Sequence, residues 1–287
     1  MLQTVVEKEK TITKKQFVQV FIVKPKKLKL EILSKSLESW VSFSVEKYPF
    51  QILEYDGKEK ITEFVKPFLT DCEYTVIISA TTPLLQEKTI DLILNYVSAK
   101  QSKATKLSVG YVFDTKYLKE SNEIFYDSLF TQNEDEFYIV ENKRQLNVAK
   151  KILIERINNF HLENGVEIVN PNTVTIEPDV FIGENVTIYP NNTLKGNTEI
   201  LDNVILKENN VIEDSIIGKS CCIINSKIEN SVVGEQSFVK SFCTIRENSQ
   251  IGAYSVIESY CDIENSQLKE NTTLKSYTKL LNGEEIV

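Results

Sequence analysis

Four lysines follow the first strongly apolar stretch of the chain. Residues Gln16–Val23 (QFVQVFIV) are predicted to form a strand, and Lys24, Lys26, Lys27 and Lys29 come directly after it. A lysine ammonium group binds phosphate as a point charge, and α/β proteins bind ligands beyond the carboxyl ends of their strands. Lys24, Lys26, Lys27 and Lys29 could therefore form a phosphate clamp. The alternative, which we favour, is a solvated turn on an acidic protein.

Two threonines occupy an equivalent place after a second predicted strand, Tyr74–Ala80. Thr81 and Thr82 could contact a ligand at the same sheet edge, but we favour a helix N-cap ahead of Pro83. The remaining titratable side chains offer no catalytic pair. His161, the only histidine, is expected near a helix C-terminus, where a positive charge suits the dipole. The isolated carboxylates are interpreted as caps or surface groups: Asp56, Asp114 and Asp127. The sequence assigns no catalytic residue and no metal ligand.

Composition excludes several classes of protein. The chain has 287 residues, room for two domains, with 41% hydrophobic and 26% charged residues. A net charge of −8 and a pI near 5.1 argue against nucleic acid as a partner. No apolar run reaches membrane-spanning length and the N-terminus is charged, so no membrane partner and a cytoplasmic location are expected. The cysteines, Cys221, Cys243 and Cys261 above all, are expected to be structural thiols.

Strand and helix patterns alternate up to about residue 164. The expected elements are strands at Gln16–Val23, Phe50–Glu54, Tyr74–Ala80 and Phe137–Val140, and helices at Lys29–Val41, Lys58–Leu69, Gln86–Lys100 and Asn142–Phe160. This alternation predicts an α/β domain with a mostly parallel sheet. Trp40 is expected in its core, and residues 133–136 (NEDE) as a solvated loop. The predicted organisation is a tail at 1–15, an α/β domain at 16–141, a linking helix at 142–164 and a second domain at 165–287.

The second domain repeats every six residues. Isoleucine, leucine or valine recurs at this interval from Ile176 to Ile286, with a few five-residue steps, and small residues such as Ser237 and Cys243 often precede it by two. In a strand both positions point to the same side. The pattern predicts a hexapeptide solenoid, a left-handed parallel β-helix with about 18 residues per turn and six and a half turns. Such prisms commonly pack side by side, so a homotrimer is expected. The asparagines at 185, 191–192 and 209–210 are expected at corners with positive φ.

Two segments resemble a known protein family and so carry more than a prediction of fold. Residues 139–170 read IVENKRQLNVAKKILIERINNFHLENGVEIVN, and the first coils follow directly. This stretch resembles the hinge and first coils of the bifunctional N-acetylglucosamine-1-phosphate uridyltransferase/glucosamine-1-phosphate acetyltransferase (GlmU) family, which carries a VNNRxQL stretch and a helix ending in H-x-x-N-G-V. Residues 79–85 (SATTPLL) resemble its C-G-D-x-P-L-L segment. The resemblance covers about residues 74–286 and implies a sugar-nucleotidyltransferase domain joined to a β-helix.

The residues that carry the family's chemistry mostly differ here. Its glycine-rich loop, which cradles the triphosphate, corresponds to the lysine-rich stretch after the first strand. Thr81 stands at the metal-binding aspartate, whereas Asn142 is retained. About a strand-hairpin's length of the family's sugar-recognition region is deleted between the neighbourhoods of residues 104 and 110. In the β-helix, Arg246 matches a sugar-phosphate arginine, but Glu264 and Asn265 stand at the lysines that follow it. Ser276 falls near the catalytic histidine, and the chain stops at residue 287, before the coils that bind acetyl-CoA. The comparison therefore predicts a truncated, degenerate member without acetyl transfer.

Three hypotheses follow. The favoured one is a non-catalytic paralogue, a trimeric scaffold that binds a protein partner or a nucleotide sugar, with no cofactor. The vestigial site would comprise Lys24, Lys26, Lys27, Thr81, Thr82 and Asn142 for nucleotide or phosphate, and Arg246 for sugar phosphate. The alternative is a drifted, Mg²⁺-dependent sugar-1-phosphate nucleotidyltransferase in UDP-N-acetylglucosamine-type synthesis. The third is one inactive subunit of a complex with an active relative.

Overall fold

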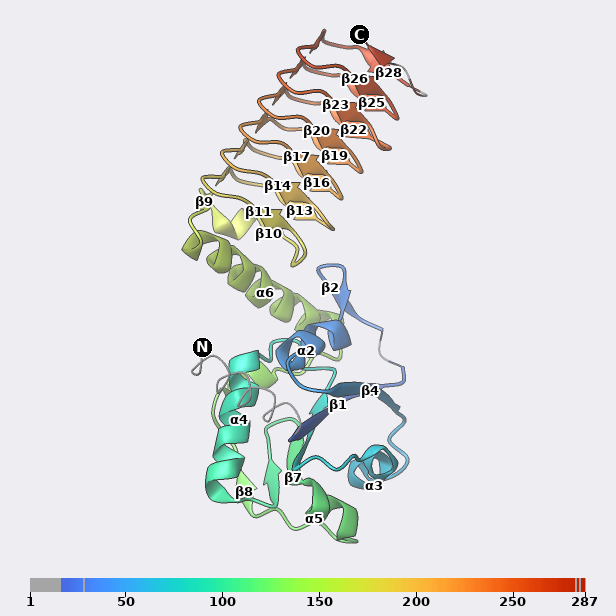
Figure 1. The fold of residues 1–287 in the computed structure, drawn as a ribbon, viewed down its shortest axis with the longest axis vertical. Helices are drawn as coiled ribbons and strands as arrows, with labels where there is room; N and C mark the ends of the chain where they lie inside the picture. Colours follow the sequence, from blue (N-terminus) through green and yellow to red (C-terminus); the bar gives the residue numbers. More distant parts are fainter. Residues whose placement is uncertain (1–16, 28, 282, 284, 287) are drawn as a thin grey trace, which may run out of the picture. The chain divides into compact units, whose positions relative to one another are not determined.

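The computed structural model describes residues 17–27, 29–281, 283 and 285–286 of the chain, with the side chains of 285–286 left out. The predicted tail at 1–15 lies outside the described residues. The chain forms two compact units, residues 1–150 and 151–287, and Figure 1 shows the α/β elements of the first and the coils of the second. Helix α6 (Lys143–Glu163) crosses the division.

The first unit is built on a six-stranded sheet. Its strands are β1 (Val18–Pro25), β4 (Phe50–Tyr55), β5 (Tyr74–Ser79), β6 (Ala104–Lys106), β7 (Tyr111–Asp114) and β8 (Ser128–Leu129), in the order β4-β1-β5-β7-β6-β8. The pairs β4-β1, β1-β5 and β6-β8 are parallel, and β7 is antiparallel to both of its neighbours. The sheet is mostly parallel, as the sequence predicted. The carboxyl ends of β1, β4 and β5 consequently share one edge.

Buried apolar side chains cover both faces of this sheet. On one side Val20, Ile22 and Val76 pack with residues of α2 (Leu37–Val45) and α4 (Glu87–Lys100). On the other, Phe21 and Ile77 pack with residues of α3 (Ile61–Val65) and α5 (Thr115–Glu120). Successive side chains of β1 thus pack on opposite faces of the sheet. Both faces are buried, which explains why the whole central stretch of β1 is apolar.

Three expected elements differ from the structure. The helix predicted at 29–41 is instead a short hairpin, β2 (Glu31–Ile32) and β3 (Lys35–Ser36), followed by α2. Leu33 and Ser34 adopt positive φ in its tight turn, which breaks the helix, and the Ser36 hydroxyl accepts a hydrogen bond from the Ser39 amide as the N-cap of α2. Trp40 is buried as expected, and its Nε1 donates to the Ile32 carbonyl.

The second difference is the helix predicted at 58–69, which is shorter. It consists of α3 and a 3-10 turn, η1 (Lys66–Phe68), because Pro67 cannot continue the α-helical hydrogen bonding. The third is the strand predicted at 137–140, which is absent. A 3-10 turn, η2 (Glu134–Phe137), stands there. Residues 133–135 are exposed, as expected, but Glu136 is buried and accepts from the Gln86 amide at 2.9 Å.

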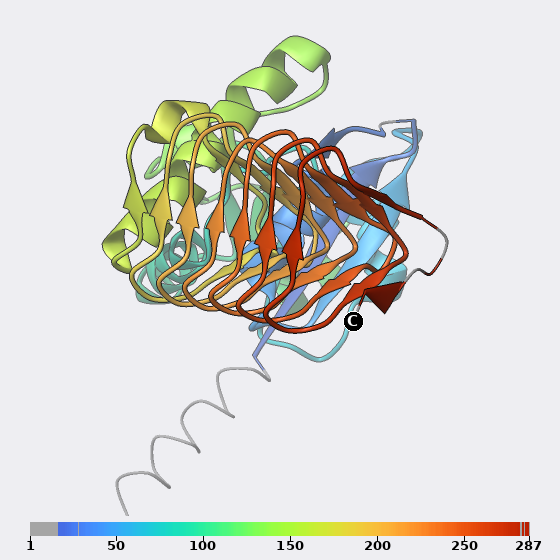
Figure 2. The same ribbon diagram turned by 90° about the horizontal axis from the view of Figure 1, so that it is seen from above.

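The second unit is a parallel β-solenoid with three seven-stranded sheets, which we name by their first strands. The β9 sheet comprises β9 (Glu167–Ile168), β12 (Thr187–Ile188), β15 (Ile205–Leu206), β18 (Cys222–Ile223), β21 (Phe238–Val239), β24 (Val256–Ile257) and β27 (Thr273–Leu274). The β10 sheet comprises β10 (Thr175–Ile176), β13 (Thr193–Lys195), β16 (Val211–Glu213), β19 (Lys227–Glu229), β22 (Thr244–Arg246), β25 (Asp262–Glu264) and β28 (Lys279–Leu280). The β11 sheet comprises β11 (Phe181–Ile182), β14 (Glu199–Ile200), β17 (Ile216–Ile217), β20 (Val232–Val233), β23 (Gln250–Ile251), β26 (Gln267–Leu268) and β29 (Glu285–Ile286). Figure 2 shows the coils stacked one on the next.

The six-residue repeat places its apolar residues in the solenoid core. Ile176 pairs with Leu194, which pairs with Ile212, so each coil spans three repeats. Where the repeat steps by five, as between Ile212 and Ile228, the inward residues remain paired. All four are fully buried. Positive φ is confirmed at Asn185, Asn191 and Asn209. At the neighbouring positions the expectation was wrong, since Asn192 and Asn210 point inward and bond to backbone carbonyls.

One corner of the solenoid changes from asparagine to aromatic residues. After Asn191, Asn209 and Asn225 the same corner carries Phe242, Tyr260 and Tyr277, all with positive φ. Their rings stack with centroids 5.0 Å and 4.9 Å apart and are largely exposed. Aromatic stacking offsets part of the backbone strain of this conformation.

Three of the five cysteines line the solenoid core. Cys221, Cys243 and Cys261 are buried, as the sequence predicted, whereas Cys72 is half-buried. Burial raises the pKa of Cys221 and of Cys243 to about 11, so little thiolate forms near pH 8.

We expect iodoacetamide to alkylate Cys72 in the folded protein at pH 8, and to alkylate Cys221 and Cys243 only after unfolding. Peptide mass spectrometry with and without denaturant measures this, and Cys72 serves as the internal control. Equal labelling of Cys243 and Cys72 in the folded protein would contradict the buried placement.

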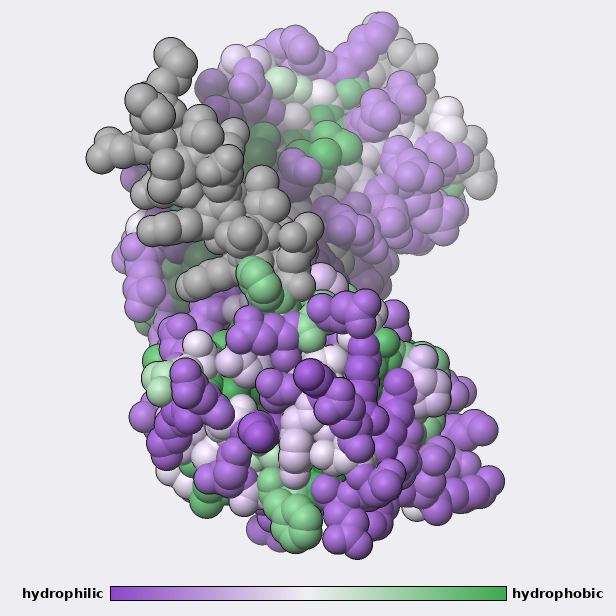
Figure 3. Space-filling view, turned by 60° about the horizontal axis from the view of Figure 1, so that its bottom comes forward, coloured by the Kyte–Doolittle hydropathy of each residue, from purple (hydrophilic) through white to green (hydrophobic). Residues whose placement is uncertain are grey.

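The described helices include none long and apolar enough to cross a bilayer. The face drawn in Figure 3 is mainly hydrophilic, and its hydrophobic patches are small and separated.

Candidate functional site

A cavity of about 870 Å³ opens at the carboxyl-end edge of the first unit's sheet. Its apolar wall includes Val23 of β1, Ile77 of β5, and Leu107 and Val109 from the turn between β6 and β7. The cavity lies where open α/β sheets bind ligands, because parallel strands present their free ends and following loops there.

A glycine keeps the β6–β7 turn close to β5. Gly110 has φ +121°, and a Cβ on it would lie 2.3 Å from the carbonyl oxygen of Ile77. The Leu107 amide donates to the Gly110 carbonyl at 3.0 Å, which closes the turn. The absence of a side chain at Gly110 therefore allows the turn to form one wall of the cavity.

The charged residues of the cavity are mostly cationic. Lys26, Lys27 and Lys106 line it together with one carboxylate, Asp56. Lys58 forms an ion pair with Asp56 at 3.0 Å, and this hydrogen-bonded lysine is the main cause that lowers the pKa of Asp56. With Asp56 already paired to Lys58, the cavity carries an excess of positive charge.

The structure separates the lysines that the sequence grouped. Lys26 and Lys27 line the cavity, but Lys24 does not, because its ammonium group forms an ion pair with Glu38 of α2. Burial alone would raise the pKa of Glu38, but the hydrogen bond and charge of Lys24 outweigh it and hold this pKa below its ordinary value. Lys24 thus links β1 to α2, and its ammonium group already has a carboxylate partner.

The two threonines contribute neither to the cavity nor to a helix cap. Thr81 and Thr82 are buried, and their hydroxyls bond to the Ser79 hydroxyl and the Ser79 carbonyl, both at 2.8 Å. Helix α4 begins later, with Gln86 as its N-cap. The favoured N-cap interpretation was therefore wrong, because the threonines instead fold the chain back as it leaves β5.

Asn142 begins helix α6. Its side-chain Oδ1 accepts from the amides of Arg144 and Gln145, each at 3.0 Å. This satisfies two of the amides that a helix start leaves free. Asn142 therefore has a structural role in this structure and does not line the cavity.

Arg246 lies in the second unit, on the outer side of the β10 sheet. Its guanidinium bonds to Asp262 through Nη1 and to Glu264 through Nη2, the latter at 2.6 Å. Both carboxylates come from the next coil, where β25 pairs with β22. The guanidinium that the sequence predicted for a sugar phosphate is thus already paired with two carboxylates.

His161 is not the cation that its position predicted. Its side chain is only 7% exposed, and burial lowers its pKa below the ordinary value. The imidazole is therefore neutral near pH 7, and it gives no favourable charge at the end of α6.

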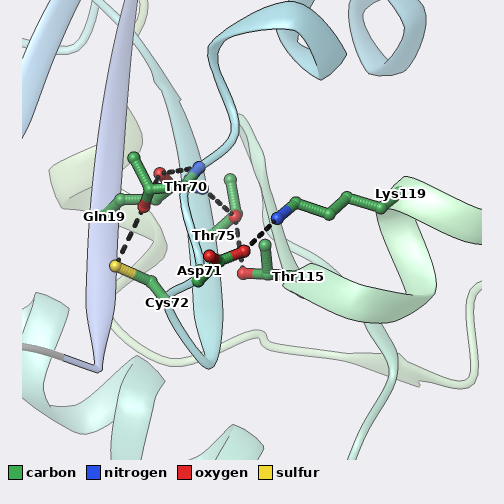
Figure 4. Close-up of polar contacts among 7 residues, drawn as sticks. All are labelled: Gln19, Thr70, Asp71, Cys72, Thr75, Thr115 and Lys119. Atoms are coloured by element: carbon green, nitrogen blue, oxygen red, sulfur yellow. Dashed lines mark hydrogen bonds and ion pairs between the residues drawn. The ribbon is translucent and has the colours of Figure 1, made fainter.

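A second polar cluster lies at the opposite, amino-terminal end of β1 and β5 (Figure 4). The Gln19 amide nitrogen donates to the Thr75 hydroxyl at 2.7 Å, which bonds to the Thr115 hydroxyl at 2.8 Å, and Thr70 donates to the Gln19 amide oxygen at 2.6 Å. The exposed pair Lys119–Asp71 lies beside it, at 2.8 Å. Every hydroxyl has a neutral partner, so the cluster joins strands and loops, and no base activates a nucleophile among the residues drawn.

The sequence missed Lys106 and the wall around it. The three-residue strand β6 is too short to produce a period-2 pattern, so nothing in the sequence marked Lys106 as lining the same cavity as Lys26 and Lys27. The described residues contain no group of three or more His, Cys, Asp or Glu side chains that could hold a metal ion.

Comparison with known proteins found no matching family model. Among curated relatives, the bifunctional protein GlmU of Streptococcus agalactiae serotype V is 33% identical over 150 residues, which are 52% of this chain and 33% of the relative. The GlmU of Staphylococcus epidermidis strain RP62A is 36% identical over 140 residues, 49% of this chain and 31% of the relative. The chain thus spans about a third of the length of the curated relatives it matches.

Solved structures share only low overall similarity with the chain. The acetyltransferase domain of PglB from Neisseria gonorrhoeae has a TM-score of 0.26 and 9% identity over 90% of this chain and 91% of that one. The UDP-N-acetylglucosamine acyltransferase of Francisella novicida has a TM-score of 0.18 and 20% identity over 40% of this chain and 54% of that one. Scores this low support no functional conclusion. Over about half its length, the chain is similar to bifunctional GlmU proteins.

Proposed function

We propose that the chain is a degenerate relative of GlmU that binds a ligand or a protein partner without turnover, as a trimeric scaffold. The partial similarity to GlmU relates it to sugar-nucleotide transferases. The observation that carries the proposal is the state of Arg246, which two carboxylates of the next coil neutralise. A sugar phosphate would have to break both ion pairs and approach Asp262 and Glu264.

The matched positions of the first unit support the same conclusion. Thr81 stands where the GlmU family has a metal-binding aspartate, and its hydroxyl is buried against Ser79. A neutral hydroxyl in this state is a poor substitute for the carboxylate that Mg²⁺ prefers. Uridyl transfer depends on metal neutralisation of phosphate charge, so its loss here removes the main catalytic contribution.

The trimer is supported by the outer face of the β9 sheet. Ile205, Cys222, Phe238 and Val256 follow one another at its outward positions, as paired neighbours in successive coils. Among the described strands, the other two sheets have no such run of four apolar outward side chains. An apolar strip along one flat face of a prism suits packing against further copies of the chain.

The test is a turnover assay with UTP, N-acetylglucosamine-1-phosphate and Mg²⁺, with pyrophosphate release as the readout. We expect no release above the enzyme-free blank, whereas a GlmU relative under the same conditions serves as the positive control. Release of coenzyme A from acetyl-CoA with glucosamine-1-phosphate is likewise expected to be absent. Turnover in either assay would overturn the proposal.

A drifted nucleotidyltransferase is the second candidate, because Lys26 and Lys27 do line the cavity at the strand ends. This candidate predicts Mg²⁺-dependent pyrophosphate release that is lost in the Lys26→Ala/Lys27→Ala variant. Co-purification with an active GlmU relative would instead favour the mixed complex.

A further inference from the structure

We propose that the open side of strand β4 binds an extended segment of a protein partner, which joins the sheet as a further, antiparallel strand. The inference rests on the proposed binding role of the chain and names the surface and the kind of partner. The residues concerned are Phe50, Ile52 and Glu54, and none of them lines the cavity at the carboxyl ends of the strands.

The first argument is the hydrogen bonding of β4 to its neighbour. Among the described strands β4 pairs only with β1, in parallel. The Val20 amide donates to the Pro49 carbonyl at 2.9 Å, and the Lys26 amide donates to the Tyr55 carbonyl at 3.3 Å. Backbone groups alternate in direction along a strand, so the odd-numbered residues of β4 point their amides and carbonyls at β1.

The even-numbered residues of β4 consequently point theirs the other way. The amides and carbonyls of Phe50, Ile52 and Glu54 face away from the sheet, and no described residue bonds to them. A row of alternating free donors and acceptors is a template for one more strand.

The second argument is that β4 has none of the features that commonly block a sheet edge. Natural edge strands are protected by lysine, proline, bulges or short length. The stretch Phe50–Tyr55 (FQILEY) is six residues long and contains neither lysine nor proline. At the other end of the sheet β8 has only two residues, and the Tyr96 hydroxyl donates to the Leu129 carbonyl at 2.8 Å. Of the two outermost strands of this sheet, β4 is therefore the one open to addition.

The third argument is the set of side chains beside the free backbone groups. Phe50 and Ile52 are 38% and 44% exposed and lie on the α2 face of the sheet. Glu54 is exposed and forms no ion pair with a described residue, because its neighbour Lys24 pairs with Glu38. An antiparallel strand is slightly more stable than a parallel one, and its side chains contact those directly opposite. A complementary partner thus reads basic-x-apolar-x-apolar, opposite Glu54, Ile52 and Phe50 in turn.

Fluorescence anisotropy of a labelled synthetic peptide with the full chain tests the inference. The peptide has the core KTVTV, which follows this pattern, and is compared with N-methylated versions. Methylation of the lysine and valines removes the amides that would face β4, whereas methylation of the threonines alters only amides that would face away. We expect the parent and the threonine-methylated peptide to bind saturably, and the lysine- and valine-methylated peptide to lose at least about tenfold in affinity.

Variants of the chain test the same contacts from the other side. Ile52→Pro should weaken binding about tenfold relative to Ile52→Thr, because proline removes one outward amide and threonine keeps it. The Ile52 amide takes no part in pairing with β1, so the fold is retained, and circular dichroism checks this. Glu54→Lys should shift the preference about threefold toward a peptide with glutamate in place of lysine.

No saturable binding of the parent peptide, equal affinities of the two methylated versions, equal affinities of the two Ile52 variants, or an unchanged charge preference in Glu54→Lys would each overturn the inference. The titration contains no nucleotide or sugar, so its failure leaves the turnover assay to decide the proposed function. Turnover of a sugar phosphate would overturn that function and leave strand addition at β4 in place.

Discussion

Replacing Phe238 with lysine is expected to reduce the mass of the protein in solution from about three chains to one. Phe238 lies in the middle of the apolar strip on the β9 sheet, between Cys222 and Val256. Its side chain points outward and is half-buried, so the substitution leaves the solenoid core intact. In a packed interface the lysine would bring an unpaired charge out of water, which is strongly unfavourable.

Light scattering coupled to size-exclusion chromatography measures the mass, and circular dichroism confirms that the variant keeps its fold. The matched control is Lys279→Glu, which changes an exposed outward residue of the β10 sheet and should leave the trimer unchanged. If Phe238→Lys remains a trimer, or if the unaltered chain is a monomer, the β9 sheet is not the interface.

Replacing Gly110 with alanine is expected to destabilise the first unit by about 3 kcal/mol. The added Cβ would meet the Ile77 carbonyl oxygen at 2.3 Å, and φ +121° is a conformation that alanine rarely adopts. Relief requires the β6–β7 turn to move away from β5, which would also displace Leu107 and Lys106 from the cavity. Ligand affinity and stability should therefore fall together.

Gly57→Ala is the matched control for this variant. Gly57 also has positive φ, +77°, but nothing lies within 4 Å of a Cβ added there. Its substitution should cost only about 1 kcal/mol, from backbone strain alone. Urea unfolding of the two variants compares the costs, and equal destabilisation would show that the close contact with Ile77 has no effect.

Period alone was enough to predict the solenoid. Each coil consists of successive six-residue repeats. Each inward residue pairs with its equivalent in the next coil, as Ile176 does with Leu194. A structure whose contacts join equivalent positions of neighbouring repeats can be predicted from the sequence without knowledge of long-range topology. The α/β class of the first unit was predicted from the alternation of strand and helix patterns along the chain, which is also a local property of the sequence.

Several predicted elements of the first unit were wrong because tight turns and tertiary packing outweighed the local sequence pattern. A helix was predicted at 29–41, but the positive φ of Leu33 and Ser34 makes a hairpin in its first part. A helical spacing of apolar residues cannot predict such a turn. The turn is stabilised by burial of Ile32 and Leu33 and by the hydrogen bond from Trp40 Nε1 to the Ile32 carbonyl.

The candidate site was also only partly predictable from the sequence, because long-range contacts decide which of its residues meet. The sequence by itself determined that lysines follow the first strand. It also predicted, from the resemblance to the GlmU family, that Thr81, Glu264 and Asn265 depart from that family's residues. Only the tertiary structure decided that Lys24 is tied to Glu38 while Lys26 and Lys27 face a cavity with Lys106. Sequence records the chemistry of a side chain, but its partners are set by which strands and loops meet at the sheet edge, and those contacts span residues far apart in the chain.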